Sequence, residues 1–102
     1  MRTLLVLFAT TCLWLTTLAA DSGAARTGAE VYRDYCASCH SGGMQGAPVA
    51  NDAEEWQPRL AKGAAALFEK AKQGFDAMPP KGTCMDCTDA ELQAAIDEML
   101  RF

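Results

Sequence analysis

The segment CASCH constrains this chain more than any other feature: Cys36 and Cys39 lie three positions apart, and His40 follows directly. The residues before it open with TGAE, which has the spacing of a helix-capping box. Apolar residues then recur at helical intervals, so we expect a helix from 28 to about 38. The two thiols therefore project from one turn at the end of a helix.

Cys-x-x-Cys-His is the attachment signature of a c-type haem. Thiols three residues apart on a helical turn point the same way, so they can bond the two vinyl groups on one edge of a porphyrin. The adjacent imidazole then lies beneath the iron. We therefore predict one covalently bound haem c, attached through Cys36 and Cys39, with His40 as an iron ligand.

Two other uses of the cysteines are less consistent with the pattern. A thioredoxin-like redox pair opens a helix after a strand, where the helix dipole lowers the thiol pKa. Here the pair closes a helix, and no strand pattern precedes it. A structural zinc site would need four thiolates, from Cys36, Cys39, Cys84 and Cys87. Zinc modules hold both pairs on tight turns in a small unit, whereas two predicted helices separate these pairs.

The second iron ligand follows by elimination, because His40 is the only histidine. Met44 follows it too closely to reach the opposite face of a haem, Met85 is constrained between two cysteines, and Met99 belongs to an apolar helical stripe. Met78 lies in a loop 38 residues after His40, and two prolines stiffen the backbone behind it. Ligation by His40 and Met78 leaves no open coordination position, which favours electron transfer over catalysis.

The N-terminal residues 1–20 have the pattern of a signal peptide. A positive charge at the second position precedes an apolar run over 4–18, and two small residues follow. The run is shorter than the roughly 20 residues of a bilayer crossing, although an uncleaved anchor stays open as an alternative. We expect export to the bacterial periplasm, a flexible tail at 21–26, and a single domain at 27–102.

The rest of the chain predicts an all-α fold. Helices are expected from Asp52, over 64–73, and after a second capping box that begins at Thr88. The last helix carries an apolar stripe made of Leu92, Ala95, Ile96, Met99 and Leu100. No segment alternates like a strand. A domain this small often needs a cofactor or a cross-link for stability.

The charge of the exported part narrows the class of partner. Removal of residues 1–20 takes away one arginine and no acidic residue, which leaves 13 acidic against 8 basic side chains. Nucleic acid is excluded as a partner, because phosphate binding needs a basic stripe. We expect redox partner proteins with a basic docking patch, membrane contact only through partner complexes, and a monomer or weak dimer.

Three segments together resemble the class I c-type cytochromes, specifically the cytochrome c5 family: CASCH, the GAP at 46–48, and AMPPKGTCMDCTDAEL at 77–92. The resemblance covers nearly all of 27–101. It implies a small fold of about four helices wrapped around one haem. It also implies a soluble periplasmic electron carrier rather than an enzyme. The alternative is a haem subunit of a membrane-anchored respiratory or dehydrogenase complex.

The resemblance also implies roles for individual residues. Cys36 and Cys39 would hold the haem, His40 and Met78 would be the axial ligands, and the Pro48 carbonyl would accept the His40 ring proton. By the same resemblance Cys84 and Cys87 would form a disulfide, and Gly28 and Tyr32 would meet the 92–96 face of the last helix.

Three further side chains have open roles in the sequence. Trp56 and Arg59 could each hydrogen-bond a haem propionate, although a core tryptophan and a surface arginine are equally consistent with the pattern. Lys81 could lie on the rim near an exposed haem edge, although a solvated lysine is the expectation.

Overall fold

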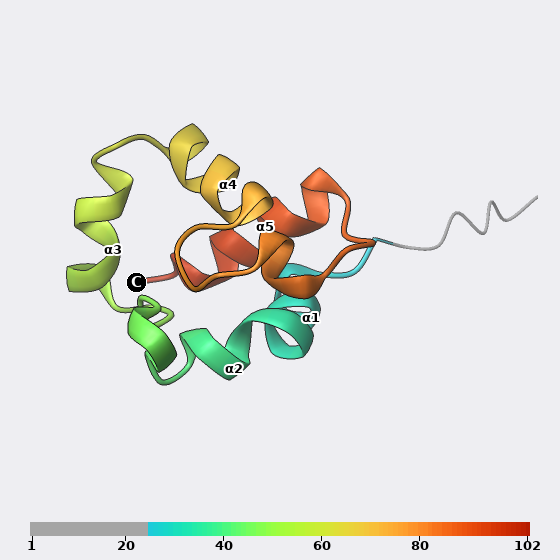
Figure 1. Cartoon of the computed structure of the whole chain (residues 1–102), viewed down its shortest axis with the longest axis horizontal. Coiled ribbons are helices and arrows are strands. Elements are labelled where there is room, and N and C mark those ends of the chain that lie inside the picture. Colours follow the sequence, from blue (N-terminus) through green and yellow to red (C-terminus); the bar gives the residue numbers. More distant parts are fainter. Residues whose placement is uncertain (1–24) are drawn as a thin grey trace, which may run out of the picture.

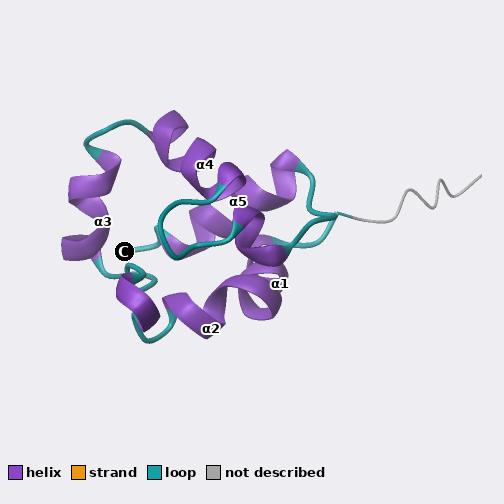
Figure 2. Ribbon diagram, in the orientation of Figure 1, coloured by secondary structure: helices purple, strands orange, loops and turns teal. Residues whose placement is uncertain are grey.

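The computed structural model describes residues 25–102. The predicted signal peptide and most of the predicted tail lie outside this part. Within it, helices and connecting loops make up the structure, and the only strand-like pairing is an isolated bridge between Phe75 and Met78 (Figure 2). The prediction of an all-α fold is confirmed.

The first helix is continuous but changes its winding. It consists of α1 (Gly28–Val31), a π-helical turn (Tyr32–Cys36) and α2 (Ala37–His40). Thr27 is the N-cap, and the predicted capping box is present. The helix therefore extends two residues past the predicted end and carries the whole CASCH segment, with Cys36 in the π-helical turn and the other four residues in α2.

Three more helices follow: α3 (Ala53–Leu60), α4 (Ala64–Gln73) and α5 (Asp89–Met99). Asp52 caps α3, and Thr88 caps α5 through the second predicted capping box. Short 3₁₀ turns lie at Met44–Gly46 and Pro80–Thr83. Figure 1 shows α3 at the opposite end of the domain from α1, with α5 running between them.

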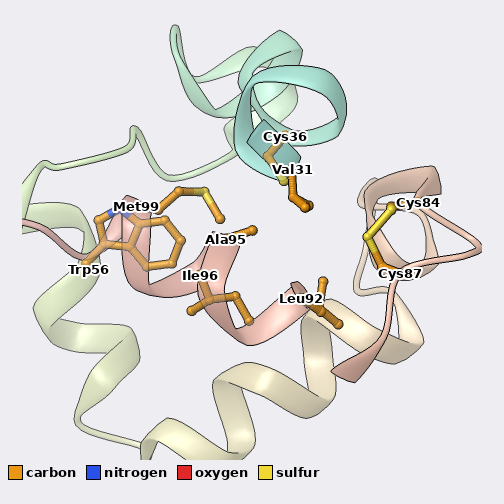
Figure 3. Close-up of a cluster of buried hydrophobic side chains, with 9 residues drawn as sticks. All are labelled: Val31, Cys36, Trp56, Cys84, Cys87, Leu92, Ala95, Ile96 and Met99. Carbon is orange, nitrogen blue, oxygen red and sulfur yellow. A yellow bond between two sulfur atoms is a disulfide. The ribbon is translucent and has the colours of Figure 1, made fainter. Parts of the chain in front are cut away.

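The core forms where α1 crosses α5. A Cβ atom built on Gly28 would lie 2.1 Å from the backbone oxygen of Ala94, so only glycine permits this approach. Val31 is 1 % exposed beneath the crossing. The apolar stripe of α5 is also buried there, except for half-buried Leu100. Figure 3 shows these side chains along α5, with the Cys84–Cys87 disulfide near Leu92 and Trp56 near Met99.

Arg26 lies at the end of the predicted flexible tail, but it is held in place. Its Nε atom lies 2.6 Å from Oε2 of buried Glu91, and its guanidinium also reaches Asp86 at 3.3 Å. Arg26 therefore packs with the domain, because a buried carboxylate on α5 needs this cation as its partner.

None of the helices in residues 25–102 combines the length and the apolar character needed to cross a membrane.

Candidate functional site

A cavity of about 400 Å³ opens between the helices. Its volume lies within the range of small-molecule and cofactor sites. The end of the first helix contributes Cys36, from the π-helical turn, and Cys39 and His40, from α2, to the wall. The loop between α4 and α5 contributes Met78. Four of the predicted site residues therefore line the same cavity, although 38 positions separate the last two in sequence.

The imidazole of His40 is buried and oriented by the backbone. Its Nδ1 atom lies 2.8 Å from the carbonyl oxygen of Pro48, and since a carbonyl only accepts, Nδ1 carries the proton. The other ring nitrogen of His40, Nε2, makes no hydrogen bond within residues 25–102. Every fully buried side-chain nitrogen or oxygen in this part of the chain has a hydrogen-bond partner, so Nε2 is not fully buried. Nε2 is therefore accessible, and on a cavity-lining residue its lone pair is available to a metal.

Trp56 packs against His40 on the cavity wall. The two ring centroids lie 5.9 Å apart with an interplanar angle of 23°. The indole Nε1 donates to the carbonyl oxygen of Val49 at 2.8 Å. Trp56 is thus a core residue, which is one of the two roles that the sequence left open. Its single N–H donor already bonds the backbone carbonyl of Val49.

The two cysteine pairs have different surroundings. Cys36 and Cys39 line the cavity and are not joined by a disulfide. Burial raises the pKa of the Cys36 thiol to about 11, which disfavours a thiolate. Cys84 and Cys87 form a disulfide outside the cavity wall. A four-thiolate zinc site does not fit this arrangement, because two of its four sulfurs are bonded to each other.

Three of the four candidate methionines line the cavity. Met44 lies on the wall but is 56 % exposed, and Met99 belongs to the buried face of α5. Half-buried Met78 is fixed by two backbone hydrogen bonds with Phe75, at 2.9 and 3.1 Å. Met85, which is 70 % exposed, is not on the wall.

The cations of the domain divide into two groups of four. One group forms ion pairs with carboxylates and lies away from the cavity: Arg26, Arg33, Lys72 and Arg101. The other group lines the cavity, and no ion pair involving it is found in residues 25–102: Arg59, Lys62, Lys70 and Lys81. Asp76 is the one acidic residue of the wall in this part of the chain. The cavity therefore suits a ligand that carries negative groups.

Two of these four cations also contact the backbone. Arg59 donates to the carbonyl oxygen of Glu55, one turn earlier in α3. Lys81 is half-buried, and its Nζ donates to the carbonyl oxygen of Cys87 at 3.1 Å. The expectation of a solvated Lys81 is wrong, because the loop around the disulfide leaves a carbonyl within its reach.

Sequence reasoning missed Lys62 and Lys70 as wall residues. Lys62 follows the end of α3, and Lys70 lies in the last turn of α4. Neither position belongs to a motif. Lys62 and Lys70 reach the cavity wall only because α3 and α4 fold around the cavity.

Sequence and structure comparisons agree on one class of protein. The family described as "Cytochrome C oxidase, cbb3-type, subunit III" matches residues 23–97. A cytochrome c5 from Azotobacter vinelandii is 47 % identical over 79 residues, which cover 76 % of this chain and 95 % of that protein. The chain is thus similar to this protein over nearly all of the relative's length.

Two solved structures have the same fold. A mono-haem ferrocytochrome c from Shewanella putrefaciens aligns with a TM-score of 0.68 and 43 % identity, over 74 % of this chain and 94 % of that one. A chain from the crystal structure of an electron transfer complex of nitrite reductase with cytochrome c aligns with a TM-score of 0.67 and 40 % identity. That alignment covers 72 % of this chain and 89 % of the other.

Proposed function

This chain belongs to the class I c-type cytochromes, in the cytochrome c5 family, and we propose that it is a soluble periplasmic electron carrier whose haem c is ligated by His40 and Met78. Members of this family carry one covalently bound haem c and are electron-transfer proteins rather than enzymes. The observation that carries the proposal is the single cavity wall that holds Cys36, Cys39, His40 and Met78.

The residues of the cavity fit a haem. Two thiols that are not joined by a disulfide lie on one helical turn with an imidazole whose Nε2 is accessible. Arg59, Lys62 and the other wall cations match the two propionate groups that a haem carries. Leu67 and Ile96 are among the apolar side chains that would pack against its ring.

When bound, the haem supplies a one-electron ferric–ferrous couple. The chain's own residues would hold it and set its properties. The Pro48 carbonyl fixes the tautomer of His40 and strengthens the imidazole as a ligand. A thioether from Met78 would favour ferrous iron and raise the reduction potential. If His40 and Met78 both bind the iron, no protein-free position would be left on the metal for a substrate.

The loop that carries Met78 is restrained on both sides. Before it, the paired hydrogen bonds with Phe75 close a tight turn. After it, the Cys84–Cys87 disulfide and the contact from Lys81 to the Cys87 carbonyl hold the backbone. These restraints lower the entropy cost of keeping a weak thioether ligand in place.

Redox partner proteins would exchange electrons with this carrier, as the cytochrome c in the nitrite reductase complex does with its partner. In residues 25–102 the acidic side chains lie outside the cavity wall, except for Asp76. They would attract a basic docking patch over long range, so association should slow as salt rises. Exposed Met44 and Phe75 offer apolar contact at the cavity itself.

An optical spectrum and an intact mass of the protein purified from periplasm test the proposal. The expected result is a Soret band, a mass equal to residues 21–102 plus one haem, and no reactive thiols. A Cys36→Ser/Cys39→Ser variant should lose the covalent haem, while Cys84→Ser/Cys87→Ser should keep it. A colourless protein with one bound zinc would contradict the proposal.

The same mass measurement tests the second candidate, a haem subunit of a membrane-anchored complex, which the description of the matching family favours. That role would require an intact N-terminus and recovery in the membrane fraction.

A further inference from the structure

The loop between α2 and α3 is attached to the C-terminal end of α5 through one side chain. Asn51 donates from Nδ2 to the carbonyl oxygens of Glu98 at 2.9 Å and Arg101 at 3.0 Å. Its backbone N–H donates to the carbonyl oxygen of Met99 at 2.7 Å. A single residue, 47 to 50 positions away in sequence, thus serves three carbonyl groups.

The end of α5 has few other partners for these groups. The last carbonyls of a helix have no partner within the helix. Many helices end at a glycine in the left-handed conformation, which lets the following backbone turn back onto them. Here the C-cap is Leu100, with φ −93° and ψ 11°, and the last turn of α5 contains no basic residue. Asn51 therefore caps α5 from another part of the chain.

The conformation of Asn51 suits this task. Its φ is 65°, in the left-handed region, which asparagine occupies more readily than most residues. Figure 1 shows the C-terminal end of the chain beside the loop that follows α2.

Residues 48–50 each form a hydrogen bond with His40, the candidate iron ligand, or with Trp56, which stacks on it. Ala50 donates from its N–H to the carbonyl oxygen of His40 at 2.7 Å, and the Pro48 carbonyl accepts from the His40 ring. The carbonyl between them, on Val49, accepts from Trp56, which stacks on the same ring. The 48–51 segment thus joins α5 to both the ring and the backbone of His40.

We propose that Asn51 is a positioning residue for His40: its side chain fixes the 48–51 segment to the end of α5 and so holds the Pro48 carbonyl against the imidazole. The importance of this contact for the haem rests on the proposed function, but the mechanical link does not. The core face of α5 is buried, whereas residues 41–47 contain two positive-φ glycines and an exposed 3₁₀ turn. Without the Asn51 side chain, the segment would lose two of its three hydrogen bonds to the end of α5 and keep the backbone bond to Met99.

Two variants, each of which removes a cap from one end of α5, distinguish the positioning of His40 from a general loss of stability. Asn51→Gly removes the side-chain amide and tolerates the positive φ. Thr88→Ala removes the cap at the other end of α5, far from His40 in the hydrogen-bond network. Both should lower the unfolding midpoint. Only Asn51→Gly should speed exchange of the His40 ring N–H and the Ala50 amide, by about tenfold for the loss of two hydrogen bonds.

The ferric protein gives a second readout. Paramagnetic shifts of the haem methyl groups report the orientation of the axial imidazole, so they should change in Asn51→Gly and stay unchanged in Thr88→Ala. Equal effects of the two variants, or no effect of Asn51→Gly on either the ring proton or the methyl shifts, would overturn the proposal. A protein without haem would contradict the proposed function, while the Ala50 exchange rate would still test Asn51.

Native-state exchange of the unmutated protein covers the case in which Asn51→Gly does not fold. In low denaturant, the Asn51 side-chain protons, the Ala50 amide and the His40 ring proton should become exchangeable in the same opening. Exchange of the His40 proton while the Asn51 protons remain protected would overturn the proposal.

Discussion

The guanidinium of Arg26 lies 2.6 Å from the carboxylate of Glu91, which is almost fully buried at the start of α5. The same carboxylate accepts from the backbone N–H of Thr88 and completes the capping box of that helix. One ion pair therefore ties Arg26, which precedes the first helix, to the helix that forms the core.

This ion pair should make the stability of the fold depend on pH. The hydrogen bond from Arg26 is the main cause that lowers the pKa of Glu91 from 4.5 to about 2, and the Thr88 backbone N–H adds to it. A carboxyl group whose pKa is lower in the folded than in the unfolded protein stabilises the fold at pH values above its unfolded pKa. This stabilisation is lost as the pH falls through the folded pKa. We expect Glu91→Gln, which keeps the capping box, to lower the melting temperature at pH 6.

The difference between Glu91→Gln and the unmutated protein should shrink between about pH 5 and pH 2, because the native carboxylate is protonated there. Thermal unfolding followed by circular dichroism at several pH values measures it. Glu98→Gln, which breaks a pair with largely exposed Arg101, is the control and should change little at any pH. A pH-independent difference for Glu91→Gln would contradict the charge argument.

Gly28→Ala should destabilise the helix crossing although alanine is the better helix former. The added Cβ would meet the Ala94 backbone oxygen at 2.1 Å, so α1 and α5 must separate. The expected loss is about 2 kcal/mol or more in the free energy of unfolding, measured by urea titration. Gly42→Ala is the matched control, because nothing lies within 4 Å of its Cβ position. It should stay within about 0.5 kcal/mol of the unmutated protein.

Met78→Ala should remove the far-red methionine-to-iron absorption band of the oxidised protein and lower its reduction potential, because the thioether no longer favours ferrous iron. Met44→Ala tests a second candidate on the cavity wall, and Met85→Ala is the control outside it. Both should keep the band. Survival of the band in Met78→Ala and its loss in Met44→Ala would reassign the ligand.

Removal of the Cys84–Cys87 disulfide should cost about 2 kcal/mol, the chain-entropy value for a loop of four residues. The double variant Cys84→Ala/Cys87→Ala, compared with the unmutated protein in urea, measures it. Haem content should be unchanged, because the pair lies outside the cavity wall. Loss of the haem along with the disulfide would mean that the pair does more than restrain the loop that carries Met78.

Local signals in the sequence predicted the helices well. Both capping boxes are present, and α4 spans the predicted 64–73. The apolar stripe of the last helix is buried up to Met99. These features depend on contacts within a few residues, which a single sequence records directly. The contact of Arg26 with Glu91 was missed, because its partner is 65 residues away.

For the candidate site too, some features follow from local sequence and others only from the fold. By itself the sequence determined the chemistry, since CASCH places two thiols and an imidazole on one turn and MPP places a thioether beside rigid backbone. Tertiary structure alone decided what surrounds these groups. It places Lys62 and Lys70 on the cavity wall, uses the Trp56 donor on the backbone, and brings Asn51 to the end of α5. Each of these depends on contacts between distant segments, and no local pattern encodes which segments meet when the chain folds.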